Sequence, residues 1–327
     1  MAREYDLGIP LEQDTLSGGS AATILLRTSR GVVVVKDGGD ERALALYKRV
    51  EEKLNAHGVR QARLHVTMSG RLTASTGQAV FEFLPGRWAW CPTAAQASAL
   101  MRYLVAYHTA LRAVPVPSFV TEVHTPWQRA DAPDYLLHEL PQVLGTAQVS
   151  PLFARAADRA LTFLADQRTL LAARPTQLVH GDVGPGNILY TDEDVVALID
   201  FTPYRESPLY ALCVSFYWHY VYANDGYPDI SRIRDDLHAY ATSAPFSVED
   251  KRAFYPTFVK VAARILFGRF LFELEAGRQP SPADKRAAII NNILVAVYND
   301  SRENGPCGLL PAQLSYRASF RRDSTAN

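Results

Sequence analysis

The spacing of apolar residues divides the chain into two unlike parts at Pro85-Gly86. Before this point, short apolar runs alternate with turn residues such as Ser29-Arg30-Gly31, a pattern typical of β-strands joined in hairpins. The runs predict strands at residues 24–26, 32–35, 62–67 and 78–84.

One segment between these predicted strands has helical spacing instead. Asp40 can cap a helix that begins at Glu41, and apolar residues recur at helical intervals as far as Leu54. His57-Gly58 follows as a stop signal. The first part of the chain is therefore predicted to be a small α+β unit with one helix.

After Pro85-Gly86 the apolar residues follow the spacing of amphipathic helices. Helices are predicted at about 94–111, at 151–173 and, in several segments, from 208 to 298. Three short apolar runs interrupt this pattern and predict tight β-structure within a helical part, at residues 177–179, 188–190 and 195–199. We therefore expect an α+β fold divided into residues 1–84, residues 85–300 and a tail, 301–327, whose Gly, Pro, Arg and Ser content predicts mobility.

Composition narrows the class of protein. The 327 residues include 34 Lys+Arg and 34 Asp+Glu, and this balance argues against a nucleic-acid partner, for which a basic excess is typical. The three cysteines are widely spaced, so they predict neither a disulfide framework nor a zinc site and fit a reducing compartment. The N-terminus has no apolar signal segment, and no apolar stretch is long enough to span a bilayer. We expect a cytoplasmic protein without a membrane partner; its oligomeric state is left open.

The strongest chemical signal is His180-Gly181-Asp182, with Asn187 five positions after the aspartate. Asp200 follows at the end of an apolar run, and a turn between two short strands would bring it near Asn187. Mg²⁺ prefers hard oxygen ligands, and Asn187 and Asp200 offer a carbonyl and a carboxylate oxygen. Asp182 would then be available to accept the proton of an attacking hydroxyl. The pattern predicts phosphoryl transfer, with Asp182 as the catalytic residue; the alternative is that these residues only make turns and caps.

These residues, with Phe201 after the second aspartate, resemble the catalytic loop and the metal aspartate of the aminoglycoside phosphotransferase/choline kinase-like family, relatives of the protein kinases. The resemblance covers roughly residues 14–300. It implies a bilobal, protein-kinase-like fold. The small N-terminal lobe would hold a five-stranded antiparallel sheet and one helix and bind nucleotide. The larger, mostly helical C-terminal lobe would hold the catalytic loop and the acceptor site.

The same resemblance implies a nucleotide site in the first lobe. Lys36, at the end of a valine run, is similar to the family's lysine that binds the α- and β-phosphates. Its partner is expected to be Glu41, in the first turn of the predicted helix, with Glu51 and Glu52 as alternatives. A small-residue loop between the first two strands would let backbone amides approach the phosphates. The residues of this loop are Ser17, Gly18, Gly19 and Ser20.

Residues 80–86 resemble the linker between the two lobes of the family. Backbone groups of Glu82 and Leu84 would hydrogen-bond the adenine, and Phe81 would lie at the back of the pocket. The resemblance implies ATP and Mg²⁺ as cofactors, with GTP left open as an alternative to ATP.

The chain departs from the family pattern after Asp200. Ser207 and Ala211 occupy positions where the family usually has aspartates, which we interpret as structural. A polycationic aminoglycoside would need carboxylates near Asp182. Candidates are Asp225, Asp229, Asp235, Asp236, Glu273 and Glu275. The aromatic run at residues 216–222 either lines a pocket or belongs to the core.

The sequence therefore predicts an ATP- and Mg-dependent phosphotransferase that moves the γ-phosphoryl group to a hydroxyl of a small molecule. Aminoglycosides, amino sugars, amino alcohols and homoserine-like compounds all fit as acceptors. The alternatives are a non-catalytic, pseudokinase-like nucleotide-binding regulator and a metal-dependent hydrolase. The combination of Lys36, Asp182, Asn187 and Asp200 disfavours the regulator, and the lack of a histidine-rich ligand set disfavours the hydrolase.

Overall fold

A computed structural model of the chain describes residues 1–16, 23–121, 135–146, 149–244, 246–278 and 283–303. The chain forms two compact units, each made from two stretches of sequence. The first unit contains Met1–His124 and Pro175–Pro245, and the second contains Thr125–Arg174 and Phe246–Asn327. Within the described residues, no helix is long and apolar enough to cross a membrane.

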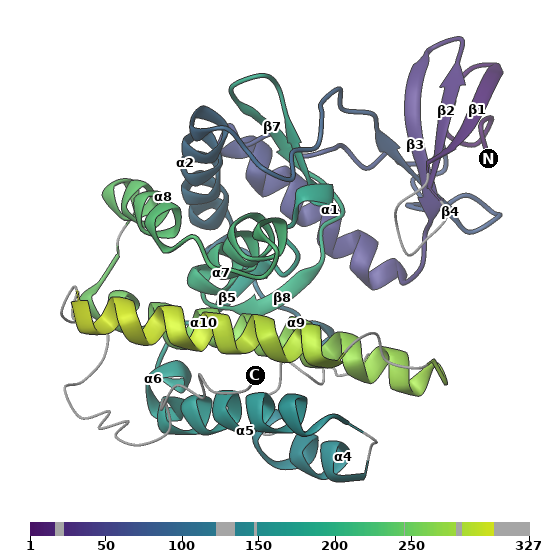
Figure 1. The fold of residues 1–327 in the computed structure, drawn as a ribbon. Helices are drawn as coiled ribbons and strands as arrows, with labels where there is room; N and C mark the ends of the chain where they lie inside the picture. Colours follow the sequence, from purple (N-terminus) through teal and green to yellow (C-terminus); the bar gives the residue numbers. More distant parts are fainter. Residues whose placement is uncertain (17–22, 122–134, 147–148, 245, 279–282, 304–327) are drawn as a thin grey trace. The chain divides into compact units, whose positions relative to one another are not determined.

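An antiparallel sheet of four strands forms the N-terminal part of the first unit, in the order β1-β2-β3-β4 (Figure 1). Its strands are β1 (Pro10–Leu16), β2 (Thr23–Thr28), β3 (Gly31–Asp37) and β4 (Gln78–Glu82). The prediction of a regular strand at 62–67 is wrong. Only residues 63–65 follow β4, through hydrogen bonds from His65 N to Val80 O and from Glu82 N to Arg63 O. The fifth strand of the expected sheet is thus reduced to a short irregular edge.

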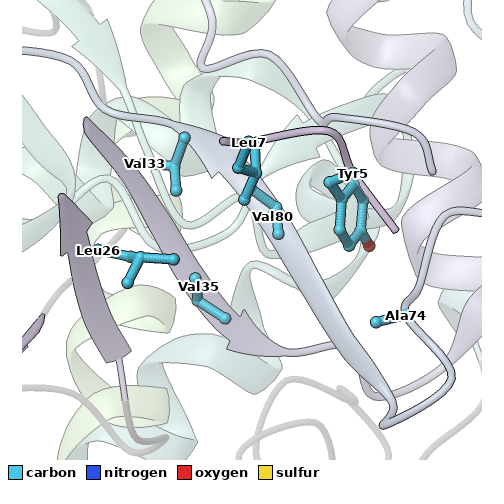
Figure 2. Close-up of a cluster of buried hydrophobic side chains, with 7 residues drawn as sticks. All are labelled: Tyr5, Leu7, Leu26, Val33, Val35, Ala74 and Val80. Atoms are coloured by element: carbon cyan, nitrogen blue, oxygen red, sulfur yellow. The ribbon is translucent and has the colours of Figure 1, made fainter. Parts of the chain in front are cut away.

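One face of this sheet is covered by the N-terminal segment. Figure 2 shows Leu26, Val33, Val35 and Val80, from three neighbouring strands, gathered with Tyr5 and Leu7 of that segment. The side chains of a strand alternate between its two faces. Because Val33 and Val35 point to this core, Lys36 points to the opposite face.

The opposite face packs against helix α1 (Glu41–Ala56). Asp40 caps this helix by accepting a hydrogen bond from Arg42 N, and His57 ends it, as the sequence predicts. Tyr47 of α1 contacts Phe81 of β4 edge to face, with ring centroids 5.2 Å apart. Phe201 packs against the same cluster, with its ring centroid 6.5 Å from that of Tyr47. The residue that follows Asp200 is therefore anchored under the sheet.

The rest of the first unit combines helices with two small strand pairs. The pairs are β5 (Gln177–His180) with β8 (Pro203–Glu206), and β6 (Ile188–Tyr190) with β7 (Val195–Leu198). The helices are α2 (Ala94–Leu111), η1 (Ser118–Thr121), η3 (Pro185–Asn187), α7 (Pro208–Tyr220), η4 (Tyr222–Asn224) and α8 (Ile230–Ser243). The three predicted apolar runs are confirmed as β5, β6 and β7, while β8 has no counterpart in the prediction.

The described residues of the second unit are helical. The elements are η2 (Tyr135–Glu139), α4 (Leu140–Thr146), α5 (Pro151–Asp166), α6 (Arg168–Ala172), α9 (Val248–Glu275) and α10 (Ala283–Glu303). The helix predicted over 151–173 is divided at Gln167, which ends α5. A buried ion pair of 2.7 Å joins Arg286 to Glu273. Most of the tail predicted to be mobile, residues 304–327, lies outside the described residues.

Two buried histidines of the first unit predict how its stability depends on pH. Burial lowers the pKa of His108 to about 3 and that of His219 to about 4. Below the pKa of an unfolded histidine, about 6.5, the unfolded chain binds protons that the folded one does not. We therefore expect the free energy of unfolding to decrease as the pH is lowered from about 6.5 toward 4. The decrease should be roughly 1.4 kcal/mol per pH unit for each histidine.

Urea denaturation at a series of pH values tests this expectation. His108→Gln should reduce the slope of the free energy of unfolding against pH by the contribution of about one proton, roughly 1.4 kcal/mol per pH unit. An unchanged slope in this variant would contradict the neutral, buried state of His108.

Candidate active site

The predicted catalytic loop begins where β5 and β8 meet. His180 is fully buried at the end of β5. Its Nδ1 accepts a hydrogen bond of 3.1 Å from Asp182 N, so its Nε2 carries the proton and donates to Ile199 O at 3.0 Å. Burial lowers the pKa of His180, which keeps the ring neutral and this pattern intact. His180 thus positions the loop.

Ile199 connects this loop to the β6–β7 hairpin. Its carbonyl accepts from His180, and its N–H donates to Asn187 O at 2.9 Å. The antiparallel pairing of Ile188 with Leu198 continues through this bond, so Asn187 and Asp200 lie at adjacent positions at the base of the hairpin. The hairpin predicted from the sequence does hold the two proposed metal ligands near each other.

Asp182 and Asn187 are in direct contact. Asn187 Nδ2 donates to Asp182 O at 2.9 Å and to Asp182 Oδ2 at 3.0 Å. The amide nitrogen therefore holds the carboxylate of Asp182, while Asn187 Oδ1 remains as an acceptor. This is the oxygen that a hard cation would use.

Lys36 pairs with Asp200 across the sequence. Lys36 Nζ lies 2.9 Å from Asp200 Oδ1, and the side chain of Asp200 is 62% exposed. Two features produce the pair: the strand alternation that turns Lys36 away from the N-terminal core, and the packing of Phe201 under the sheet. Asp200 itself has φ 58°, the left-handed region that Asp and Asn tolerate better than most residues.

The expected pairing of Lys36 with Glu41 is not tested by the structure. Glu41 is exposed at the start of α1, and within the described residues no ion pair joins Lys36 to Glu41, Glu51 or Glu52. Glu51 is buried and accepts hydrogen bonds from Lys48 Nζ, at 3.0 Å, and from Leu64 N, at 2.9 Å. The assignment of Glu41 stays a prediction. The loop residues Ser17, Gly18, Gly19 and Ser20 lie outside the described residues.

The proposed adenine-binding residues follow β4. Glu82 N donates to Arg63 O at 2.8 Å, so this amide is already used. Leu84 is buried against Ala62, Leu189 and Ala197. No hydrogen bond is made by the backbone N–H of Leu84 in the part of the chain that the structure describes. Because buried amides are almost always paired, this N–H is a candidate donor to a ligand.

The aromatic run at 216–222 is divided between core and surface. Phe216, Tyr217 and Tyr220 are buried, whereas Trp218 is half-buried and Tyr222 is 49% exposed. Trp218 lies against the catalytic loop: a Cβ added at Gly184 would be 3.2 Å from Trp218 Cδ1 and 3.7 Å from Asp182 Oδ1. The sequence left open whether this run lines a pocket or belongs to the core, and the structure divides its residues between interior and surface.

The carboxylates considered for a polycationic acceptor are divided between the two units. Asp229 caps α8, and Asp236 accepts a hydrogen bond from Tyr220. Glu273 belongs to the second unit, where it binds Arg269 and Arg286. Within the described residues, no group of three or more His, Cys, Asp or Glu side chains is arranged to hold a metal ion.

Solved structures share this fold. An aminoglycoside phosphotransferase from Alicyclobacillus acidocaldarius is 16% identical, with a TM-score of 0.62 over 90% of this chain and 95% of that one. A spectinomycin phosphotransferase, solved with ADP and spectinomycin, is 12% identical, with a TM-score of 0.58 over 88% and 93%. Both are matched along nearly their whole length, which places the chain among proteins with a kinase-like fold.

Sequence comparison assigns the family. The chain belongs to the phosphotransferase enzyme family, whose sequence model matches residues 13–246. A homoserine kinase from Bradyrhizobium sp. (strain BTAi1 / ATCC BAA-1182) is 27% identical over 241 residues. That match covers 69% of this chain and spans 65% of the length of the relative.

Gly181 provides a test of how the loop is built. A Cβ at this position would overlap the ring of Tyr204 in β8, which stacks on Tyr210 with ring centroids 6.0 Å apart. We expect Gly181→Ala to lower the free energy of unfolding by about 1–3 kcal/mol, as in an overpacked core. Gly186→Ala is the matched control, because a Cβ there meets no atom within 4 Å. Equal stability of the two variants in urea denaturation would argue against this packing.

Proposed function

We propose that the protein transfers the γ-phosphoryl group of ATP, in the presence of Mg²⁺, to a hydroxyl group of a small molecule. The observation that carries the proposal is the bonding of Ile199 to both His180 and Asn187. Through it Asp182, Asn187 and Asp200 lie on one connected loop and hairpin, with Lys36 on Asp200. A base, two oxygen ligands and a cation are the groups that phosphoryl transfer needs in one place.

The donor atoms fit a magnesium–nucleotide complex. Asn187 Oδ1 and the second carboxylate oxygen of Asp200 would hold the ion, which neutralises charge on the transferred phosphoryl group when bound. Lys36 would bind the α- and β-phosphates, with Glu41 as its proposed partner because Glu51 is already bound to Leu64 and Lys48. Ser17, Gly18, Gly19 and Ser20 are proposed to approach the phosphates through their backbone.

Leu84 and Glu82 are proposed to recognise the adenine. The buried N–H of Leu84 would donate a hydrogen bond, and the carbonyl of Glu82 would accept one, as its own N–H is already used. Such backbone recognition also fits a guanine base, so GTP remains the alternative nucleotide. We propose that residues 1–84 serve nucleotide binding, that residues 85–300 serve catalysis and acceptor binding, and that the protein acts in the cytoplasm.

Asp182 is proposed to orient the acceptor hydroxyl and to take its proton. Asn187 Nδ2 holds the carboxylate through Oδ2, which leaves Oδ1 toward Gly184. The proton would move from the acceptor oxygen to Asp182 as that oxygen bonds to phosphorus and the bond to the β-phosphate oxygen breaks. The 27% identical homoserine kinase keeps homoserine-like acceptors among the candidates.

Substitution of the two aspartates tests the proposal. Asp182→Asn and Asp200→Asn should each lower kcat by at least about a hundredfold, the usual minimum for loss of a general base or a metal contact. Both should fold, because Asn preserves the shape of each side chain and tolerates the left-handed backbone of Asp200.

ADP release with MgATP is the measurement, and circular dichroism verifies folding. Activity close to that of the unsubstituted protein in either variant would refute the proposal. If the unsubstituted protein binds nucleotide without turning it over, the pseudokinase-like alternative is favoured. If it neither binds nor turns over nucleotide, both readings are refuted. Turnover of a phosphate ester without nucleotide would indicate the hydrolase.

A further inference from the structure

Three aromatic side chains form a continuous exposed surface in the first unit. Trp90 is 54% exposed and Tyr222 is 49% exposed. The ring of Tyr222 lies 5.9 Å from that of Trp90 and 5.1 Å from that of Trp218, measured between centroids. We call Trp90, Trp218 and Tyr222 the aromatic surface. Exposed apolar surface of this kind usually marks a place where something binds.

The aromatic surface begins at the catalytic loop. A Cβ added at Gly184 would lie 3.2 Å from Trp218 Cδ1, 3.4 Å from Trp218 Nε1 and 3.7 Å from Asp182 Oδ1. The edge of the indole and the carboxylate oxygen of the proposed base thus border the same residue. A molecule lying on the aromatic surface could therefore bring a hydroxyl to Asp182.

Residues 87–92, the segment that carries Trp90, are held by hydrogen bonds at both ends. Arg87 exchanges two backbone hydrogen bonds of 2.9 Å with Tyr190 of β6. Arg232 donates to Pro92 O at 3.2 Å while its guanidinium lies over Tyr220. Ordering a side chain on binding costs free energy, and a segment held in place in advance avoids part of that cost.

Ring geometry and charge indicate the kind of ligand. Centroid separations of 5.1 and 5.9 Å are contact distances, so no space remains between these rings for an ammonium group. Three carboxylates of this part of the chain are engaged by the protein: Asp192 by Arg87, Asp229 by the α8 cap and Asp236 by Tyr220. Asp225, directly after η4, is exposed. The planes of Trp218 and Tyr222 are inclined at 69° and those of Trp90 and Tyr222 at 34°, so the rings offer separate faces and no enclosing cage. With one exposed carboxylate, Asp225, beside them, they favour the face of a neutral ring over a polycation.

We propose that Trp90, Trp218 and Tyr222 form the acceptor subsite and that they stack against a neutral ring bearing hydroxyl groups, such as a sugar or a cyclitol. The C–H groups on the face of such a ring carry partial positive charge, which the negative faces of aromatic rings attract. One ring hydroxyl would then face Asp182. This inference rests on the proposed phosphotransferase function and specifies its acceptor class.

Acceptor-stimulated ADP release tests the proposal. The neutral probes are D-glucose, N-acetyl-D-glucosamine and myo-inositol, and the charged probes are kanamycin, choline and L-homoserine. At least one neutral ring should stimulate ADP release. Trp90→Ala and Tyr222→Ala should each raise its KM about tenfold, equivalent to about 1.4 kcal/mol, with the larger effect on KM rather than on kcat. Circular dichroism and thermal unfolding verify that each variant folds.

Trp88→Ala is the matched control. Trp88 belongs to the same segment and is 56% exposed, yet it makes no ring contact with the aromatic surface within the described residues. Its substitution should leave the KM of the neutral ring unchanged. An equal rise of KM in this variant would attribute the effect to the whole segment and would contradict the proposal.

The outcomes separate this inference from the proposed function. Stimulation only by kanamycin, choline or L-homoserine would overturn the neutral-ring subsite and leave the phosphotransferase intact. If no probe stimulates ADP release but MgATP hydrolysis still requires Asp200, the neutral-ring subsite is likewise overturned and the phosphotransferase proposal stands. If the unsubstituted protein shows no nucleotide turnover at all, both the acceptor subsite and the phosphotransferase function are overturned.

Discussion

The site depends on one residue with no reactive group, Ile199. Its carbonyl accepts a hydrogen bond from the Nε2–H of His180, and its N–H donates one to the backbone carbonyl of Asn187. These two bonds fix the register between the catalytic loop and the β6–β7 hairpin. Because a slip of one residue in a strand turns every side chain to the other face, the side chain of Asp200 would be lost from the site if either bond were displaced. Burial of His180 protects the bond, since a neutral imidazole can accept from Asp182 N and donate to Ile199 at once.

Lys36 reaches the site because of a second, independent constraint. The alternation of β3 sends Val33 and Val35 into the core under the N-terminal segment and Lys36 to the face that holds α1. Phe201 packs on that same face against Tyr47, and it carries Asp200 with it. The ion pair of Lys36 with Asp200 is therefore a product of apolar packing. Each partner is placed by a neighbour in the chain that packs against an apolar cluster, Val35 for Lys36 and Phe201 for Asp200. The pair itself is partly exposed and needs to contribute little free energy of its own.

The sequence was sufficient to predict those elements whose ends are set by residues close together in the chain. Helix α1 has the predicted ends because Asp40 and His57 act within a few residues. The spacing of Asp182, Asn187 and Asp200 predicted a hairpin, and β6 and β7 form it. The signals failed where tertiary contacts decide. Strand β1 is exposed along its whole length and shows no buried alternation, while residues 63–65 pair with β4 too briefly to make the predicted strand.

The candidate site shows the same division between local and tertiary information. The two aspartates and the asparagine could be chosen from their spacing, because the loop and hairpin are contiguous in sequence. The ion pair of Lys36 with Asp200 could not be predicted in this way, since the two residues are 164 positions apart in the chain. Trp218 was equally hidden. Helix α7 is apolar on all sides, so only the contact with Gly184 separates this ring from its buried neighbours.

The exposure of Tyr222 has a simple cause in the end of α7. While the helix lasts, Phe216, Tyr217 and Tyr220 stay inside the first unit. After Tyr220 the chain turns into the short helix η4, and Tyr222 leaves the core to pack on the outer side of Trp218. The point at which α7 stops therefore sets the exposure of Tyr222, one of the three rings of the proposed acceptor subsite.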